Sequence, residues 1–219
     1  AMLFADWLMA DGFTVETSDQ LTSLRSLRHE DVDLIVPVWT MGEIAEDDRN
    51  AVVRAVAGGT GLAGCHGGMA DAFRSDTAWQ FLTGGQFVAH PGNDHVRYRV
   101  EVGDEGKHPA HAITEGIDSF EVKSEQYYLH IDPAVRVLAS TIVPPAATMT
   151  DSDETRRAHP DLFGPHTANG PVRMPVIWTK RYGEGRIFYN ALGHAPTVLE
   201  HEPVATMMRR GFLWAAKRL

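Results

Sequence analysis

The chain has 219 residues, of which 43% are hydrophobic and 22% charged, the composition of an ordinary folded globular protein. Its formal net charge of -9 argues against nucleic acid or an anionic membrane surface as the main partner. A single cysteine, Cys65, excludes an internal disulfide framework and a multi-cysteine zinc site, and there is no apolar run of the roughly 18 residues that would span a membrane. The length predicts one domain over residues 1–219.

The first half of the chain alternates helical and strand-like segments. The apolar run DLIVPVW at 33–39 is typical of a parallel strand buried on both faces. This rhythm predicts an α/β fold, namely a three-layer, doubly wound, mainly parallel sheet of the flavodoxin or amidotransferase type. Periodicity and capping residues predict the other elements: a helix over 1–10, a short strand over 12–17, a helix over 19–29, a helix over 43–57 and a strand ending near residue 65.

The chain starts directly with a helical pattern. Residues 1–10 place Leu3, Trp7 and Ala10 on one face, and neither a strand nor a signal peptide precedes them. We therefore expect that the first strand of the α/β unit is missing from the sequence, together with the pocket residues that its loop would carry. Cytoplasm is the default location expected for a chain with no visible targeting signal.

The second half is richer in strands and predicts a β-rich edge and a hairpin added to the sheet. The polar, proline-rich stretch 144–170 is interpreted as a long loop that could act as a lid. The predicted elements are strands at 86–90, 96–102, 120–130 and 135–143, a hairpin of 174–182 and 186–190 turning at Gly183-Glu184-Gly185, and a final helix over 202–219 with an apolar stripe.

The central motif is GGTGLAGCHGGMADAF, residues 58–73. It predicts a strand, a tight turn and the start of a helix, an elbow that holds its tip residue over the carboxyl edge of a sheet, where nucleophiles and ligand-binding groups lie. Small neighbours such as Gly64 and Gly67 suit so sharp a turn, because a Cβ there would collide with the reversing backbone. Two registers stay open: since side chains alternate along a strand, the tip presents either the Cys65 thiol or the His66 imidazole. A plain turn with Cys65 as a buried filler is the structural alternative.

Three further segments carry polar side chains that suit a site. His194 follows the strand-like RIFYNA and is placed to act as a general acid, a general base or a ligand. Glu125 and Tyr127, two residues apart in a predicted strand, share one face and could bind a sugar hydroxyl or orient a histidine. His90 opens a polar turn that includes Asn93 and lacks the spacing of a strong zinc motif. Each segment could equally be an ordinary surface loop or strand face.

Taken together, these stretches resemble the ThuA-like family, named for trehalose utilisation, which has a class I glutamine-amidotransferase-like fold. In that family the elbow reads Gly-apolar-His-Gly, so the resemblance places His66 in the nucleophile position and turns Cys65 into the sheet. His194 is followed by Ala195 and Pro196, so a cysteine-histidine-carboxylate triad is not supported. The likeness covers nearly the whole chain and lies in GTGLAGCHGG (59–68), FLTGGQFVAHP (81–91), HPAHAITEG (108–116), SEQYYLH (124–130), MPVIWTKRYGEGRIFYNALGH (174–194) and RRGFLWAA (209–216).

The resemblance implies a carbohydrate-metabolism protein that binds or transforms a sugar or keto-sugar, such as a trehalose-type disaccharide, at the carboxyl edge of the sheet. The implied partner is a small-molecule carbohydrate, without nucleic acid or membrane, and a homo-oligomer is left open. No cofactor is firmly implied, although a divalent metal such as zinc, held by some of the histidines and Glu125, is an open alternative. The residues implied are His66, His194 and Glu125 as catalytic groups and Gly67, His90, Asn93, Tyr127 and Trp178 as substrate-binding groups.

Two alternatives come from other classes of protein. A glutamine-amidotransferase-like hydrolase would use Cys65 and would need a reactive thiol, so a buried thiol would exclude it. A non-catalytic binding or interaction module would use the same pocket and would bind without turnover.

Overall fold

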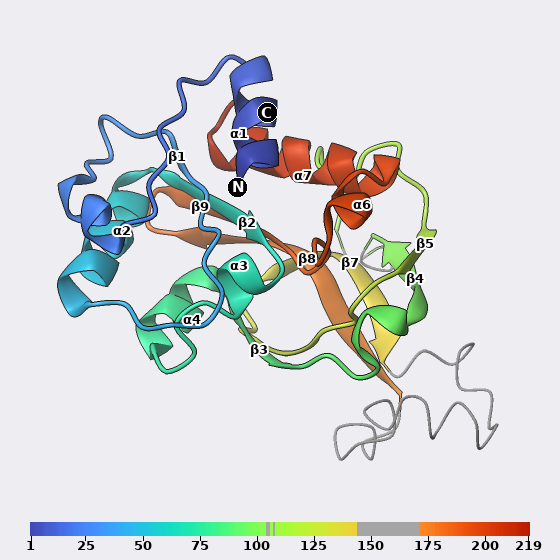
Figure 1. Cartoon of the computed structure of the whole chain (residues 1–219). Helices are drawn as coiled ribbons and strands as arrows, with labels where there is room; N and C mark the ends of the chain where they lie inside the picture. The colour runs from blue at the N-terminus through green and yellow to red at the C-terminus, as the bar shows by residue number, and fades with distance from the viewer. Residues whose placement is uncertain (104–105, 107, 144–170) are drawn as a thin grey trace.

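The computed structural model describes residues 1–103, 106, 108–143 and 171–219. Its centre is a seven-stranded sheet with the strand order β1-β2-β9-β8-β7-β4-β5, accompanied by a two-stranded sheet of β3 and β6 (Figure 1). The strands are β1 (Leu34–Ile35), β2 (Gly61–Cys65), β3 (Gly85–Ala89), β4 (Arg97–Val102), β5 (Phe120–Lys123), β6 (Tyr128–Ile131), β7 (Arg136–Val143), β8 (Val172–Tyr182) and β9 (Gly185–Asn190). The helices are α1 (Met2–Ala10), α2 (Glu46–Gly58), α3 (Gly67–Ala70), α4 (Thr77–Thr83), α6 (Pro196–Leu199) and α7 (Glu202–Ala215), with short 3-10 helices η1 (Leu21–Ser26) and η2 (Asn93–His95).

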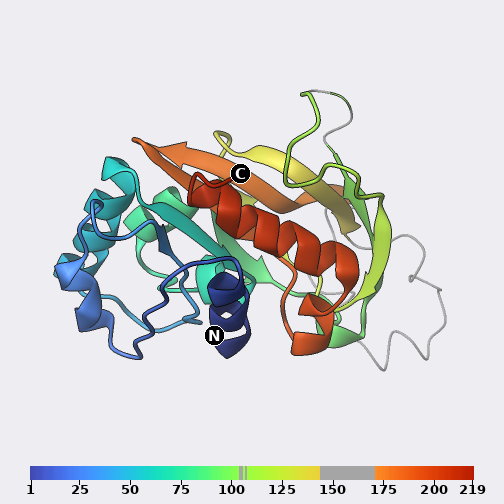
Figure 2. The same cartoon turned by 90° about the horizontal axis from the view of Figure 1, so that it is seen from above.

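Helices cover both faces of the sheet, as the α/β prediction requires. Figure 1 shows α1 and α7 on one side of the sheet and α3 and α4 on the other, and Figure 2 shows α7 lying along the sheet. The approach of α7 is close, because a Cβ at Gly61 would lie 2.4 Å from the carbonyl oxygen of Ala215, and one at Gly211 would lie 2.3 Å from the ring of Phe188. The predicted apolar stripe of the last helix is confirmed by its buried side chains Val204, Met207, Met208, Phe212 and Ala215.

The large sheet is mixed, and most of its strand pairs are antiparallel. β2 pairs in parallel with β1 and with β9, whereas β8, β7, β4 and β5 pair antiparallel along the sheet. The prediction of a mainly parallel sheet is therefore wrong. β8 and β9 are joined by the predicted turn at Gly183-Glu184, and so short a loop can join only antiparallel neighbours, because parallel ones need a crossover of about a dozen residues or more.

Several predicted strands differ from the structure. The apolar run 33–39 contributes only the two residues of β1, because Pro37 has no backbone N–H for a ladder and the chain then turns toward the elbow, where the N–H of Trp39 donates to the carbonyl of Gly68. Residues 12–17 form no strand, and the helix predicted over 19–29 is the short η1. The strand predicted over 120–130 is split into β5 and β6, which belong to different sheets. The loop predicted over 144–170 lies outside the described residues.

The core is continuous from α1 through the sheet to α4. Large side chains such as Trp178, Tyr189, Phe188 and Phe73 are fully buried in it. Within the described ranges, no helix is both long and apolar enough to cross a bilayer. Because β2 and β9 are buried in this core, the loops that follow their carboxyl ends start from well-packed strands.

Candidate functional site

The elbow at residue 66 presents the imidazole and buries the thiol. β2 ends at Cys65, α3 begins at Gly67, and His66 between them has φ 51° and ψ -144°, a strained conformation for a residue with a side chain. The N–H of His66 donates to the carbonyl of Asn190 at 2.7 Å, which ties the turn to the end of the neighbouring strand β9. Of the two registers that the sequence left open, the structure has the one in which His66 stands at the tip.

Cys65 points into the interior, as the family resemblance implied. Its side chain is buried, and a Cβ at Gly193 would lie only 2.7 Å from its Sγ. Burial raises the pKa of the Cys65 thiol to about 12, so the thiolate needed for nucleophilic attack does not form near neutral pH. This burial argues against the glutaminase alternative.

Glu125 and Tyr127 reach His66 from the connection between β5 and β6. Tyr127 Oη lies 2.9 Å from His66 Nδ1, and Glu125 Oε2 lies 3.1 Å from His66 Nε2. The backbone at this point is held by Tyr98, whose hydroxyl donates to the carbonyl of Glu125 at 2.9 Å. The two side chains do share one direction, as predicted, but they lie in an irregular connection and not in a strand. Gly67 leaves room for this approach, because a Cβ there would lie 3.3 Å from Tyr127 Oη.

Two more histidines surround the same carboxylate. His194 Nδ1 lies 3.3 Å from Glu125 Oε1, and His90 Nε2 lies 4.0 Å from the same oxygen. The side chains of His90 and His194 are partly exposed, whereas those of His66 and Glu125 are largely buried. We call these four residues, His66, His90, Glu125 and His194, the His–Glu cluster. It has a buried floor and an opening to solvent.

The electrostatics of the cluster keep the carboxylate charged and the deepest imidazole neutral. Burial by itself raises the pKa of Glu125, but the contact with His66 and the charges of His90 and His194 outweigh it, so the pKa lies below its ordinary value. Burial lowers the pKa of His66, and the neighbouring Glu125 only partly opposes this. At neutral pH the cluster therefore combines an ionised carboxylate with a neutral imidazole, the states needed to accept protons or to bind a cation.

Not every predicted site residue joins the cluster. Trp178 is fully buried and donates its ring N–H to the carbonyl of Thr83 at 3.0 Å, so this structure gives no support to its predicted role in binding substrate. Asn93 begins η2, close after His90 along the chain, and its side chain is exposed; its role stays a prediction. Gly67 packs against Tyr127, and a direct contact with substrate stays a prediction too.

Two tyrosines that support the site were not predicted. Tyr98 holds the backbone of Glu125, and Tyr189 donates its hydroxyl to the carbonyl of His66 at 3.2 Å. Both are buried strand residues, and strand periodicity alone does not distinguish an aromatic side chain that fills the core from one that positions a catalytic loop.

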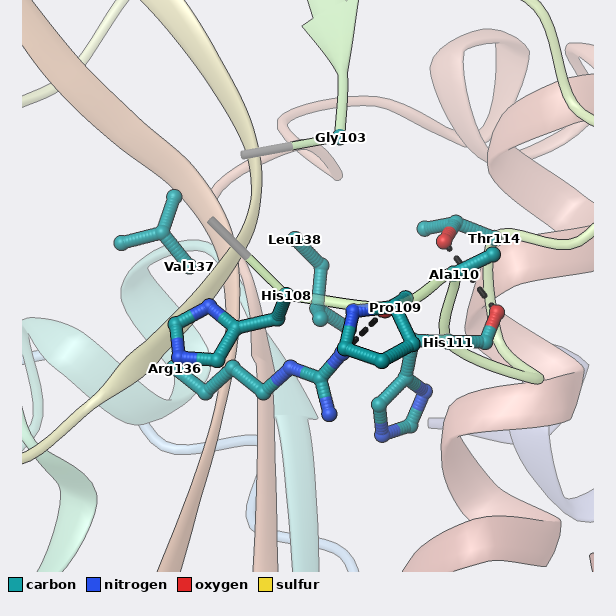
Figure 3. Close-up of a pocket in the computed structure, with 9 residues that line it drawn as sticks. All are labelled: Gly103, His108, Pro109, Ala110, His111, Thr114, Arg136, Val137 and Leu138. Carbon is teal, nitrogen blue, oxygen red and sulfur yellow. Dashed lines mark hydrogen bonds between the residues drawn. The ribbon is translucent and has the colours of Figure 1, made fainter. Parts of the chain in front are cut away.

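A small pocket lies elsewhere, between the segment 108–114 and β7 (Figure 3). Its polar walls come from His108, His111 and Arg136, and the guanidinium of Arg136 donates to the carbonyl of Pro109 at 2.5 Å. Figure 3 also shows Thr114 donating to the carbonyl of His111. The described residues that line this pocket are all different from those of the His–Glu cluster, so the two are separate features.

Comparison with known proteins identifies relatives over nearly the whole chain. The family model for ThuA, described as trehalose utilisation, matches residues 1–215. A ThuA-like protein from Bacteroides uniformis ATCC 8492 is 18% identical with a TM-score of 0.66, over 98% of this chain and 81% of that chain. A ThuA-like protein from Parabacteroides merdae ATCC 43184 is 16% identical with a TM-score of 0.62, over 93% of this chain and 77% of that chain.

A larger protein contains a similar fold as one part. The β-galactosidase from Rahnella sp. R3 is 14% identical with a TM-score of 0.53, and the match covers 95% of this chain but 25% of that chain. A search of curated proteins gave no match. At these identities the solved structures show likeness of fold alone.

Proposed function

Because this chain belongs to the ThuA family, whose description is trehalose utilisation, we propose that it binds and transforms a sugar or keto-sugar, such as a trehalose-type disaccharide, at the His–Glu cluster. The observation that carries the proposal is convergence. Residues 66, 90, 125 and 194 are far apart in the sequence, yet the three histidine side chains surround the Glu125 carboxylate at the carboxyl ends of β2 and β9. β2 and β9 are parallel neighbours, and in α/β sheets the carboxyl ends of parallel strands are where ligands bind.

The chemistry of the cluster suits an oxygen-rich ligand. The Glu125 carboxylate accepts hydrogen bonds from sugar hydroxyls, and the imidazoles donate to or accept from the others. The half-open arrangement places His194 and His90 between the buried floor and the solvent, where they can exchange protons with water and with the ligand.

The reaction class that we propose is proton transfer beside a sugar carbonyl. A keto group acidifies the neighbouring C–H; an imidazole of the cluster takes that proton, and the electron pair moves onto the carbonyl oxygen to form an enediolate. Return of a proton to the former carbonyl carbon, with transfer of the neighbouring hydroxyl's proton to the former carbonyl oxygen, gives isomerisation. Expulsion of a glycosidic oxygen from the β carbon, which leaves with a proton from the cluster, gives cleavage. Both outcomes use the same first step.

Thermal-shift and turnover measurements test the proposal with trehalose, a 3-keto-disaccharide and glutamine. A ligand at about 100 times its dissociation constant adds roughly 2.7 kcal/mol to the free energy of unfolding, which is several degrees for a domain of this size. We expect shifts with the sugars and none with glutamine. His66→Ala should lose turnover, whereas His130→Ala, an exposed histidine on β6, should not.

Two results would change the conclusion. Full sugar affinity and turnover in His66→Ala would refute the role of the cluster. Binding of a sugar without any turnover would make the site a binding module and would refute the catalytic half of the proposal.

A further inference from the structure

We propose that the His–Glu cluster is a divalent transition-metal site, with His66 Nε2, His194 Nδ1 and the Glu125 carboxylate as ligands and zinc as the fitting metal. This inference adds a metal ion to the site of the proposed function. It rests on that function only for the proposal that a sugar is the molecule that the ion would bind. The ligand atoms of these three residues all lie within 4.8 Å of one another. They come from three segments that the fold brings together, so the grouping is not a by-product of neighbouring positions in the sequence.

Two of the separations between these atoms are those of ligands sharing one ion. Zinc bonds of about 2.0–2.2 Å to nitrogen and oxygen place two adjacent ligands about 3.0–3.4 Å apart, for angles between octahedral and tetrahedral. Here the distance from His66 Nε2 to Glu125 Oε2 is 3.1 Å, and that from His194 Nδ1 to Glu125 Oε1 is 3.3 Å. The two imidazoles therefore face opposite oxygens of the same carboxylate at ligand spacing.

His66 Nε2 also lacks the partner that a buried nitrogen normally has. It approaches Glu125 without the geometry of a hydrogen bond, and within the described part of the chain it has no other hydrogen-bond partner. The great majority of buried polar atoms have a hydrogen-bond partner, so an unpaired buried nitrogen indicates a partner, such as an ion, that binds there. A cation lying between the nitrogen and the carboxylate would satisfy both.

The outer partner of His66 is arranged as it is for metal-binding histidines. Such a histidine uses its second ring nitrogen in a hydrogen bond that fixes the tautomer and the ring orientation. Tyr127 Oη takes that place, 2.9 Å from His66 Nδ1. With a metal bound, Nδ1–H would donate to this hydroxyl, and Nε2 would keep its lone pair for the ion. Tyr127 is thus a positioning residue and not a ligand.

Two imidazoles and one carboxylate are the ligand set of catalytic zinc sites, in which the remaining positions stay open for water or substrate. The open side here is marked by the exposed fraction of the His194 side chain, 38%, and by His90 beside it. An ion at this point would bind the carbonyl oxygen and an adjacent hydroxyl of a sugar and would polarise the carbonyl. His90, 4.0 Å from Glu125, would remain available to move the proton.

The test is titration of the full chain, freed of metal with a chelator, with Zn²⁺ by calorimetry and with Co²⁺ by visible absorption, in the absence of sugar. We expect one ion per chain and a Co²⁺ spectrum of low coordination number. His194→Ala and Glu125→Gln should abolish the site, and Tyr127→Phe should weaken Zn²⁺ binding about 10- to 100-fold. His130→Ala, exposed on β6, and the buried Cys65→Ala are the matched controls and should bind Zn²⁺ as the natural chain does.

Far less than one ion per chain in the natural protein would overturn the inference, as would Zn²⁺ binding that survives both ligand substitutions in variants shown by circular dichroism to be folded. The outcomes also separate the two proposals. If sugars raise the thermal-unfolding midpoint of a protein that binds no Zn²⁺, the metal site is refuted and the proposed function is retained. If the protein binds one Zn²⁺ per chain but no sugar changes its midpoint, the metal site is retained and the proposed function is refuted.

Discussion

The ion pair between Lys180 and Asp132 gives a sharp prediction about stability. Lys180 lies in β8 with a side chain that is 4% exposed, and its Nζ is 2.7 Å from Asp132 Oδ2. The same ammonium contacts the carbonyl oxygen of Phe81, and the N–H of Ala134 donates to Asp132 Oδ1 at 2.8 Å. The substitution Asp132→Asn keeps the shape of the side chain but leaves a buried ammonium without its counter-charge.

The expected cost follows from the burial of the pair. Breaking a buried pair by removing one partner destabilises by about 3–5 kcal/mol. Asp132 retains 15% exposure and Lys180 keeps the Phe81 carbonyl, so we expect the lower end, about 3 kcal/mol. At about 2–4 °C per kcal/mol for a domain of this size, the midpoint of thermal unfolding should fall by about 6–12 °C.

The pH dependence has a definite sign. Burial alone would raise the pKa of Asp132, but the Lys180 ammonium and the backbone N–H of Ala134 lower it below its ordinary 3.8. As the pH falls, the Asp132 carboxylate is therefore protonated in the unfolded chain before it is protonated in the folded protein. Its contribution to stability is complete above the pKa of the unfolded state and is lost as the pH falls through the pKa of the folded state. The difference between the natural chain and Asp132→Asn should therefore shrink below about pH 4.

Urea unfolding followed by circular dichroism, at neutral pH and in an acid series, measures both effects. Asp31→Asn is the matched control, because Asp31 pairs with Arg28 at 2.9 Å with both side chains mostly exposed, and such pairs contribute about 0–1 kcal/mol. A loss in Asp132→Asn no larger than in Asp31→Asn would refute the reasoning, as would a gap between the natural chain and Asp132→Asn that widens in acid.

Three other substitutions test the elbow and the pocket. Cys65 should react slowly with iodoacetamide in the folded protein and quickly in urea, and Cys65→Ala should keep full sugar turnover; rapid alkylation of the native thiol would contradict its burial. Gly193→Ala should lower the free energy of unfolding by about 1–3 kcal/mol, because φ at this position is +139° and the new Cβ would press on Cys65 Sγ. Adding Cys65→Ala should recover only the part of this loss that comes from the steric contact, and an unchanged urea midpoint in Gly193→Ala would contradict the prediction. Burial and the charges of Arg136 and Arg186 lower the pKa of His111, so the natural chain should lose stability as the pH falls below about 6.5. In urea titrations, His111→Gln should reduce the dependence of the free energy of unfolding on pH, and an equal dependence in both proteins would contradict the prediction.

The candidate site was more predictable from the sequence than the sheet around it. The glycine-flanked elbow, whose steric demands are local, predicts a tip at Cys65 or His66, and the family resemblance selects His66. His194 is predicted from its place after a strand-like segment, and Glu125 from its place within another. Whether two neighbouring strands run parallel or antiparallel is not determined by the local sequence of either strand. A strand buried on both faces can carry the same apolar run whether its neighbours are parallel or antiparallel, so β7 carries no mark of its pairing. For β8 the sequence marks only the antiparallel pairing with β9, through the hairpin turn at 183–185.

Trp178 shows a second limit of sequence reasoning. It alternates with Lys180 on one face of β8, and both side chains are buried under the end of α4, where they bond to the carbonyls of Thr83 and Phe81. Sequence periodicity assigns two residues to one face, but it does not say which element covers that face.

The position of β9 has a consequence for the growing chain. Among the described strands, β9 comes last along the chain, yet it lies between β2 and β8 and is the only link between the parallel and antiparallel parts of the described sheet. A ribosome-bound fragment ending before residue 185 would hold two half-sheets with unpaired edges, the kind of edge that recruits foreign strands. His194 follows β9 directly, so the pairing of β9 that closes those edges also brings this histidine to Glu125. A chain that ends before residue 194 therefore cannot form the complete His–Glu cluster.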